Sequence, residues 1–425
     1  MTDSQQVQLP PLKFPQGIDN RSREYAVSQD ALRVCDNLDV TRDGGLLSRK
    51  GMRSVAAGDC HSIFAHPSQR FALVVIDGQL SRMDSDETIT ALVEVVGTVA
   101  YAIFNDDVYW TDGKSVGQIT AQGEIGVWGM NSPPSPLVTV LASGGLHAGT
   151  YQVAMTAVHS SGIESGASEP VTVTLAEGEG LSITTPAASG VQFAIYRTTA
   201  NGGKDELRQA FLANPATTVE LGIGSLGKHL ETLYVVKPIS GQCIAHHKGR
   251  LWVASENVVW FTDAKSPHWL RPEQGYYQFE SRVSMLGAAE DGLYVGLYDR
   301  VYFLQGTDPE KMTQRLVSSV GAVPGSATEI PYDVFLGDSG FPTRQCAWWD
   351  REGFLCIGKP GGILIRPTKP RYSAGESAGG SMTYRADSGL RQLVTALSTT
   401  SEQPLVAKDT LITETFSNAV VLNTQ

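Results

Sequence analysis

The sequence Gly249-Arg250-Leu251-Trp252-Val253-Ala254 is followed by Ser255-Glu256-Asn257 and then by Val258-Val259-Trp260-Phe261-Thr262-Asp263. Two apolar runs rich in Val, Trp and Phe lie on either side of a short polar break that contains Asn. This pattern is typical of two antiparallel strands joined by a tight turn. We therefore predict a β-hairpin over residues 249–263.

The hairpin pattern recurs along the chain. A second copy spans Gly292–Phe303, about 42 residues further on, and a third spans Tyr101–Asp112. A weaker copy covers Leu355–Ile365, in which Leu355 matches Leu293 and Ile363 matches Val301. For the residues between these copies, Val317–Phe341, we predict a degenerate blade or a loop. A repeat of about forty residues with two visible strands in each copy predicts blades of a β-propeller.

Bulk composition favours an all-β chain of several domains. The 425 residues are enough for two or three domains, 41% of them are hydrophobic, and 44 are glycine. The net charge is −11. Because binding to phosphate groups needs clustered Lys and Arg, this acidic chain is a poor candidate for a nucleic-acid-binding protein.

A proline-rich stretch, Asn131–Pro136, marks a change of rhythm and a predicted domain boundary. Between residues 133 and 238 we expect a different module, because short alternating runs follow one another there. The predicted strands are Val138–Ala142, Thr150–Val158, Val171–Leu175, Leu181–Thr184, Val191–Arg197 and Thr218–Leu221. Gly149–Ala154, the turn Ser160–Ser165 and Gln192–Arg197 resemble parts of a fibronectin type III or related immunoglobulin-like sandwich.

The predicted organisation is therefore an all-β chain, a β-propeller with an inserted fibronectin type III/immunoglobulin-like β-sandwich. Its parts are an N-terminal arm (1–36), a first propeller part (37–132), the inserted sandwich (133–238) and a second propeller part (239–425). Residues 368–390, rich in Gly, Ser and Ala, are predicted to be loop. Residues 37–56 and the strand-like stretches Leu390–Leu397 and Val406–Leu422 are expected to close the ring, since an open propeller leaves unpaired sheet edges.

The arm and the cysteines carry no targeting or metal signal. The N-terminal segment is predicted to be an extended arm, on the basis of Pro10, Pro11 and Pro15, and this arm either crosses a neighbouring subunit or frays. Because Met1–Gln8 is polar, we predict no signal peptide. No apolar run reaches the ~18 residues of a membrane span. The five cysteines lack zinc-like spacing and suit a reducing cytosol, with Cys346 and Cys356 expected as two packed thiols across a hairpin rather than a functional disulfide.

A search for chemistry yields candidates that are each better explained by structure. Asp84-Ser85-Asp86-Glu87 and Asp106-Asp107 are the densest acidic spots, but both fall in predicted turns, which favour Asp. His246 and His247 are adjacent on a predicted strand and so point to opposite faces, and His268 lies further on. We expect no catalytic, cofactor-binding or metal-binding residues and no cofactor.

Aromatic residues divide into two sets. Those at equivalent positions of the copies are expected in the core: Tyr109, Trp110, Trp252, Trp260, Tyr294 and Tyr302. Those outside the repeat are better candidates for an interface: Trp128, Trp269, Tyr276 and Tyr277.

Two segments resemble a family of virion proteins. Asn37-Leu38-Asp39-Val40 with the following Gly45–Met52 is similar to the opening of β-propeller proteins from tailed phages. Val259–Ala264 with Pro267-His268-Trp269 is similar to a blade segment of the same proteins. The overall plan resembles the tail hub or nozzle proteins of short-tailed phages, including the packaged-DNA stabilisation group, over residues 37–130 and 240–370. The inserted sandwich departs from the simplest members.

The resemblance implies a ring of identical subunits, expected to be hexameric, around a DNA channel. Its partners would be other tail proteins (a portal-side adaptor and distal tail or fibre proteins), with DNA passing through unbound and no membrane. The expected function is a non-catalytic structural component of a phage tail, located in the virion and in the host cytoplasm during assembly. The alternative is a carbohydrate- or receptor-binding propeller, and a propeller glycoside hydrolase is the third possibility.

Overall fold

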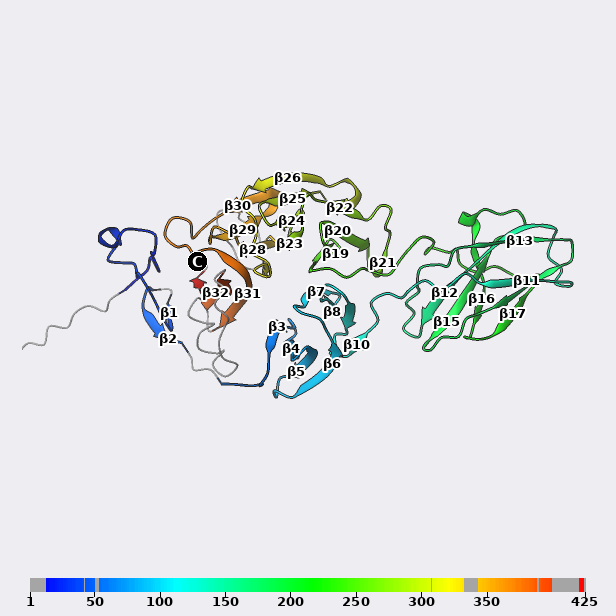
Figure 1. Cartoon of the computed structure of the whole chain (residues 1–425), viewed down its shortest axis with the longest axis horizontal. Helices are drawn as coiled ribbons and strands as arrows, with labels where there is room; N and C mark the ends of the chain where they lie inside the picture. Colours follow the sequence, from blue (N-terminus) through cyan, green and yellow to red (C-terminus); the bar gives the residue numbers. More distant parts are fainter. Residues whose placement is uncertain are drawn as a thin grey trace, which may run out of the picture. The chain divides into compact units, whose positions relative to one another are not determined.

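A computed structural model of the protein describes residues 13–41, 43–49, 53–306, 308–331, 343–387, 390–399 and 420–423. Throughout this part of the chain the regular elements are β-strands and short 3-10 helices, without an α-helix (Figure 1). The chain forms two compact units. Unit 1 combines Met1–Ala100 with Phe279–Gln425, and unit 2 is Tyr101–Gln278.

Unit 1 contains three four-stranded antiparallel sheets, each a meander in chain order. Such meanders are the blades of a β-propeller, the all-β fold class predicted above. The first is β3 (Cys60–Ala65), β4 (Phe71–Ile76), β5 (Gln79–Asp84) and β6 (Ile89–Glu94). The second is β23 (Val283–Ala289), β24 (Gly292–Leu297), β25 (Val301–Gln305) and β26 (Thr313–Ser318). The third is β27 (Thr328–Ile330), β28 (Gln345–Trp349), β29 (Leu355–Lys359) and β30 (Ile363–Ile365).

Neighbouring blades of unit 1 pack face to face through aromatic side chains. The rings of Tyr294 on β24 and Trp348 on β28 lie 5.2 Å apart, and both side chains are fully buried. The Tyr294 hydroxyl also donates to the carbonyls of Lys359 (2.6 Å) and Ile363 (3.0 Å). Because both faces of β24 are covered, its six residues are all buried, which explains its unbroken apolar sequence. Tyr294 is thus a core residue, as predicted, and so are Tyr109, Trp110 and Trp252. Trp260 and Tyr302, which were also predicted in the core, are only partly buried.

Unit 2 contains two further blade-like sheets. One is β7 (Ala100–Phe104), β8 (Asp107–Thr111), β9 (Val116–Ile119) and β10 (Ile125–Gly126). The other is β18 (Cys243–His247), β19 (Arg250–Ser255), β20 (Val258–Asp263) and β21 (Ser266–Leu270), with β22 (Tyr276–Gln278) also paired to β20. The two sheets are joined by Thr111, whose hydroxyl donates to the Gly241 carbonyl (2.8 Å) and accepts from the Gly241 amide (2.9 Å).

The predicted hairpin over residues 249–263 is confirmed. β19 and β20 pair antiparallel with Trp252 opposite Phe261 and Val253 opposite Trp260, and Glu256 in the turn has φ +50°. The Asp77-Gly78 turn between β4 and β5 has positive φ at both residues, +49° and +78°. Positive φ at both central positions is the type I′ geometry that the Asp-Gly signal predicts.

The copies of the repeat align differently in the structure. β19 and β20 are the second and third strands of their sheet, as are β24 and β25, whereas the Tyr101–Asp112 copy forms the first and second strands, β7 and β8. The Leu355–Ile365 copy is also displaced, because it forms the third and fourth strands, β29 and β30, of its sheet. The second strand there is β28, so Trp348 and Trp349, rather than Leu355, occupy the strand that corresponds to the one with Tyr294. The prediction of hairpins is confirmed, but the alignment of these two copies was shifted by one strand.

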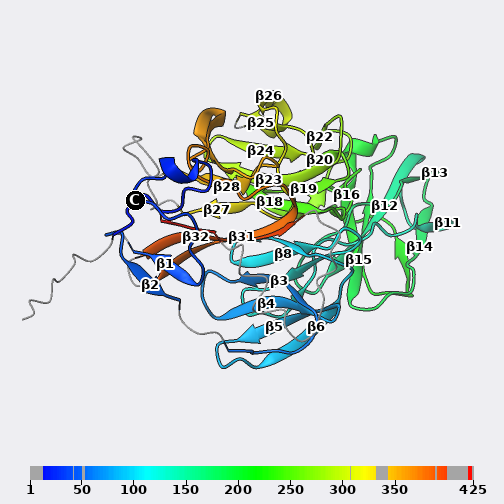
Figure 2. The same ribbon diagram turned by 60° about the vertical axis from the view of Figure 1, so that its left-hand side comes forward.

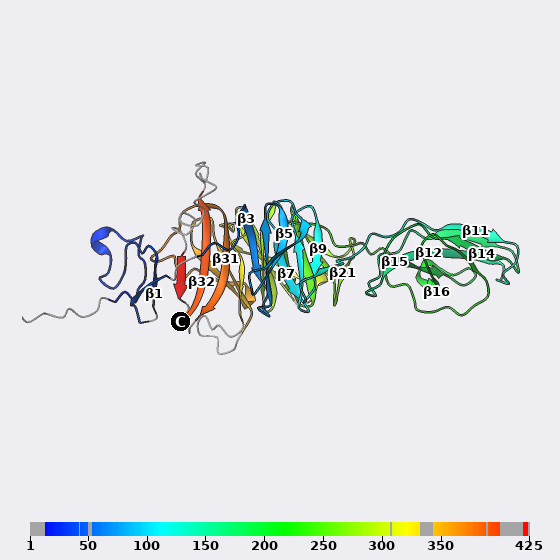
Figure 3. The ribbon, with the colours of Figure 1, turned by 90° about the horizontal axis from the view of Figure 1, so that it is seen from below.

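Residues 137–221 form two sheets around one core. One sheet has the order β11 (Leu137–Leu141), β14 (Gly180–Thr184), β17 (Thr218–Leu221). The other has the order β13 (Val171–Leu175), β12 (Gly149–His159), β15 (Val191–Arg197), β16 (Arg208–Ala213) (Figure 3). Buried Tyr151, Val153, Leu181, Ile183 and Ile195 belong to a single apolar cluster that draws on both sheets.

All six strands predicted in this region are present, with shifted ends in some, and β16 was missed. The first strand pairs with the fourth and the fourth with the seventh. This order differs from the ABED and CFG sheets of immunoglobulin constant domains. The assignment to the fibronectin or immunoglobulin class, and the domain boundaries at 133 and 238, stay predictions.

The N-terminal segment folds back onto unit 1 in its described part. Asn20 exchanges side-chain hydrogen bonds with the backbone of Ser373 (2.8 and 3.0 Å), and the Arg21 guanidinium lies 5.0 Å from the centre of the Phe354 ring. Residues 13–36 therefore dock on their own chain, and the prediction of an extended arm is wrong for them. Residues 1–12, including Pro10 and Pro11, lie outside the described residues.

The strands expected to close the ring form separate sheets. β1 (Leu38–Val40) pairs only with β2 (Leu46–Ser48), while β31 (Ser377–Asp387), β32 (Leu390–Thr399) and β33 (Val420–Asn423) form a three-stranded sheet (Figure 2). Within the described residues neither set adds a strand to a blade. The loop prediction for 368–390 is wrong from Ser377 onward, where β31 runs for 11 residues. Most of Val406–Leu422 and part of Val317–Phe341 lie outside the described residues.

Candidate functional site

Glu164 lies at the base of the sandwich and gathers three side-chain donors. Its Oε1 accepts from Thr156 (2.7 Å) and from the hydroxyl of Tyr196 (2.6 Å), and its Oε2 pairs with Lys228 Nζ at 2.6 Å. The carboxylate is buried, and Lys228 reaches it from the surface. Burial, followed by the hydrogen bond to Glu164, raises the pKa of Tyr196 well above its usual range. Lys228 therefore compensates the charge of a carboxylate whose oxygens are already occupied.

The same residue joins the sandwich to strand β21. Trp269 on β21 donates its indole N–H to the Glu164 carbonyl across 2.7 Å. Beside it, Val236 and Leu270 exchange two backbone hydrogen bonds of 2.9 Å. Gly166 passes so close to the Val235 carbonyl that a Cβ atom would come within 1.8 Å of that oxygen, so only glycine fits. The sandwich is thus tied to the blade by backbone contacts as well as by Trp269.

A polar hollow of about 220 Å³ opens at this junction. It is lined by the turn before Glu164 and by the start of β21: Ser161, Gly162, Ile163, Glu164, Lys265, Ser266, His268 and Trp269. Gly162 and Lys265 both have positive φ, +86° and +60°, so two tight turns shape its rim. Because Glu164 is already paired, Lys265 supplies the uncompensated positive charge of the lining.

His268 contributes a neutral imidazole to the lining. Burial lowers its pKa below the ordinary value of 6.5, against an opposing effect of Asp107. Its Nδ1 is buried without a hydrogen-bond partner in the described part of the chain. A buried ring nitrogen without a partner is an unsatisfied polar group, of the kind that an ordered water molecule or a ligand can satisfy.

The four aromatic residues predicted at an interface differ in their burial and contacts. Trp128 is a core residue, because it is 3% exposed and donates to the Pro267 carbonyl at 2.6 Å, so its prediction as an interface residue is wrong. Trp269 lines the hollow. Tyr276 on β22 is exposed and packs on Trp260 with ring centres 5.2 Å apart, whereas Tyr277 is partly buried against Trp252 and Phe261.

The histidines and acidic spots have packing and turn roles. His246 meets the Phe104 ring edge-on at 5.1 Å, and His247 is buried near Trp252. Asp107 accepts from the Gln118 side chain (2.6 Å) and the Ala121 amide (2.9 Å), and Asp106 has φ +66° in its turn. Asp84 pairs with Arg82 and Asp86 accepts from the Thr88 amide. Among the described residues no group of three or more His, Cys, Asp or Glu could hold a metal ion.

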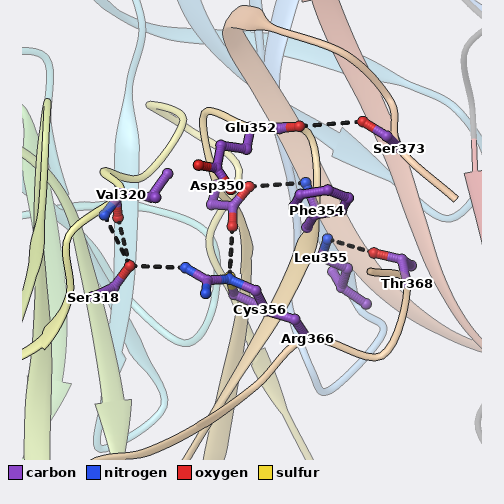
Figure 4. A network of polar contacts seen from close by, with 10 residues as sticks. All are labelled: Ser318, Val320, Asp350, Glu352, Phe354, Leu355, Cys356, Arg366, Thr368 and Ser373. Carbon is purple, nitrogen blue, oxygen red and sulfur yellow. Dashed lines mark hydrogen bonds and ion pairs between the residues drawn. The ribbon is translucent and has the colours of Figure 1, made fainter. Parts of the chain in front are cut away.

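A buried charge network stabilises the third blade of unit 1 (Figure 4). Asp350, 1% exposed, accepts from the Phe354 amide at 2.9 Å and pairs with Arg366 Nε at 2.8 Å. Arg366 also donates to Ser318 of the neighbouring sheet, 2.9 Å away. Each polar group of the network is therefore satisfied within the fold, as expected of a structural rather than a catalytic cluster.

The buried cysteines belong to this blade. Cys346 lies opposite Gly358 and Cys356 opposite Trp348, and both thiols are free and buried. The expectation of two packed thiols is confirmed. Burial raises the pKa of each far above the usual range, so neither is a nucleophile at neutral pH.

The residues of the hollow were not found from the sequence. The turn Ser160–Ser165 was recognised, but Glu164 carries no local signal of its partner Lys228, 64 residues away. His268 and Trp269 were noticed separately, without the turn that they face. Only the fold brings these three segments together.

Comparisons with known proteins found no matching family model and no matching curated protein. Among solved structures, a complex described as BBS1N with ARL6DN matches at a TM-score of 0.34 and 12% identity, covering 88% of this chain and 98% of that one. The N-terminal domain of Nup159 matches at 0.32 and 9%, covering 80% and 73%. The AfRom2 CNH domain matches at 0.26 and 7%, covering 79% and 89%. TM-scores this low carry no argument about function. No helix among the described residues is long and apolar enough to cross a membrane.

Proposed function

We propose that the protein is a non-catalytic structural subunit of a bacteriophage tail, a hub- or nozzle-like component of a hexameric ring around the DNA channel. One of the two segments that carry the resemblance, residues 37–52, is described over 37–41 and 43–49, where it forms the ribbon β1–β2. The observation that supports an assembly role is the exposure of apolar side chains on this ribbon.

The β1–β2 ribbon exposes its second strand, because all three residues of β2 are exposed while those of β1 are half-buried. Successive residues of a strand point to opposite faces, yet Leu46 and Leu47 are 40% and 55% exposed. The ribbon is a two-stranded sheet joined to no other described strand. An isolated pair of strands is marginally stable in water, and its open edges readily pair with another chain.

The occupant that we propose for this ribbon is a second copy of the chain. Tyr25 (81% exposed) and Val34 (65% exposed), which precede the ribbon in the chain, add to the exposed apolar surface of the N-terminal segment. Arg49 and Asp39 form an ion pair of 3.0 Å across the ribbon, so the strands are held in register before a neighbour arrives. A net charge of −11 suits a conduit through which DNA passes without being gripped.

The test is the oligomeric state of the purified full chain, measured by native mass spectrometry over a range of concentrations and by negative-stain imaging. We expect rings, and we expect the double variant Leu46→Glu with Leu47→Glu to remain monomeric. The matched control, Leu137→Glu with Val140→Glu, changes two exposed apolar residues on the edge strand β11 and should assemble normally. Monomers at every concentration, or rings formed equally well by the ribbon variant, would contradict the proposal.

A second candidate function, binding of a carbohydrate or a receptor, is favoured by one observation, the polar hollow between the Glu164 turn and β21. It is compatible with the first, because a tail subunit can carry a binding site on an inserted domain.

A further inference from the structure

The hollow at residues 161–164 and 265–269 combines an aromatic wall, free polar groups and one uncompensated cation. We infer that it binds a single sugar unit that carries a carboxylate, such as a terminal uronic acid. This inference concerns the hollow alone and does not rest on the proposed assembly role.

The size of the hollow limits what it can hold. Its volume of about 220 Å³ lies below the ~300–1,000 Å³ of pockets that enclose drug-sized ligands. The volume of a single sugar ring is of the same order as that of the hollow. Further units of a longer glycan would therefore lie in solvent. The hollow is open to solvent, so the rest of a glycan chain can leave it.

The wall favours a sugar over a simple anion. Trp269 and Ile163 supply apolar surface, while Ser161 and Ser266 supply hydroxyl groups beside it. Trp269 is fixed in place, because its indole N–H is committed to the Glu164 carbonyl at 2.7 Å. A fixed aromatic wall with adjacent hydroxyls matches the mixed apolar and polar surface of a sugar ring.

Two residues of the lining, Ser161 and His268, have hydrogen-bonding capacity left over. The Ser161 amide and hydroxyl both lie against His159 Nδ1, at 3.2 and 2.8 Å, which leaves the hydroxyl oxygen able to accept from a ligand hydroxyl. His268 Nδ1 is one of the buried nitrogens without a hydrogen-bond partner among the described residues. A ligand hydroxyl can serve that nitrogen as donor or acceptor, depending on the tautomer of the neutral ring.

The charge of the lining selects a carboxylate. The Glu164 carboxylate is occupied by Thr156, Tyr196 and Lys228, and its charge is compensated by Lys228 at 2.6 Å. Lys265, exposed on a turn with φ +60°, is then the only charged group of the lining without a compensating partner in the described chain. An ammonium group at the rim favours a sugar acid over a neutral sugar.

The experiment titrates the full-length protein with glucuronic acid and, separately, with glucose, using saturation-transfer NMR and tryptophan fluorescence. We expect saturable binding of glucuronic acid in the millimolar range and clearly weaker binding of glucose. Lys265→Gln should weaken glucuronic acid binding about tenfold, as expected for the loss of one charge-assisted contact. Ser161→Ala should weaken both sugars without removing the preference for the acid.

The matched control is Lys114→Gln, which removes the same charge from an exposed turn between β8 and β9 and should leave binding unchanged. Melting temperatures equal to that of the wild type show that each variant is folded. The inference is overturned if the wild-type protein shows no saturable binding of glucuronic acid. It is also overturned if Lys265→Gln binds as tightly as the wild type, or if Lys114→Gln loses as much affinity as Lys265→Gln.

Discussion

The indole N–H of Trp269 donates to the backbone carbonyl of Glu164 across 2.7 Å, and so joins strand β21 of a blade to a turn of the sandwich. The side chain of the same glutamate collects donors from β12, β15 and Lys228. One residue thus organises the inside of the sandwich with its carboxylate and its attachment to the blade with its backbone.

Trp269→Phe tests the contribution of this hydrogen bond. The ring is largely kept but the donor is lost, so we expect the free energy of unfolding of unit 2 to fall by about 1 kcal/mol. Amide hydrogen exchange should accelerate at residues 161–165 and 266–270. Trp260→Phe on β20 is the matched control, since no hydrogen bond of its indole is found within the described chain, and it should leave those amides unchanged. Equal effects of the two variants would show that the hydrogen bond contributes nothing.

The ion pair of Asp350 and Arg366 gives a second prediction. Asp350→Asn leaves the guanidinium of Arg366, 22% exposed, without its carboxylate, and we expect a loss of about 3 kcal/mol in the free energy of unfolding. The comparison is Asp84→Asn, which breaks a pair with Arg82 whose side chains are 28% and 30% exposed. That change should cost under ~1 kcal/mol in urea unfolding, because water screens an exposed pair. Similar costs for both would contradict a buried structural role for Asp350.

The hairpins could be predicted from the sequence because their information is local. Asp77-Gly78 demands positive φ at both turn residues, and the flanking apolar runs pair directly across the turn. Strand position within a blade is not local information. Val108–Asp112 and Val259–Asp263 have the same apolar pattern, yet β8 is the second strand of its sheet and β20 the third. The second and third strands of a meander are both flanked by strands on either side and are largely apolar, so sequence similarity alone could not tell them apart.

Segments stabilised by distant partners were missed for the same physical reason. β31 contains Gly379 and Gly380 and has weak β propensity, but it pairs with β32 along its whole length. The N-terminal segment is held by residues about 350 positions away, such as Ser373. The hollow depends on the turn at Glu164 meeting β21, 105 residues later. Tertiary contacts decide these features, and no local pattern encodes them.

The last prediction concerns pH and His268. Burial lowers the pKa of this imidazole in the folded protein below the ordinary value of 6.5, so the unfolded chain binds a proton more readily than the folded one. Stability due to the neutral ring is therefore complete above pH ~6.5 and is lost as the pH falls from there towards the folded-state pKa. His268→Gln removes the titrating group, so its melting temperature should fall less than that of the wild type between pH 7 and pH 5.

The control for the pH series is His147→Gln, which removes an exposed histidine beside Glu177 on the sandwich surface. Its side chain is 83% exposed, so this substitution removes a histidine without removing a buried ring, and it separates the two effects. If His268→Gln follows the wild-type profile, the buried ring does not resist protonation, and the hollow must admit enough water to solvate it. In that case a ligand that bonds to His268 Nδ1 would first have to displace the water that solvates it, which weakens binding.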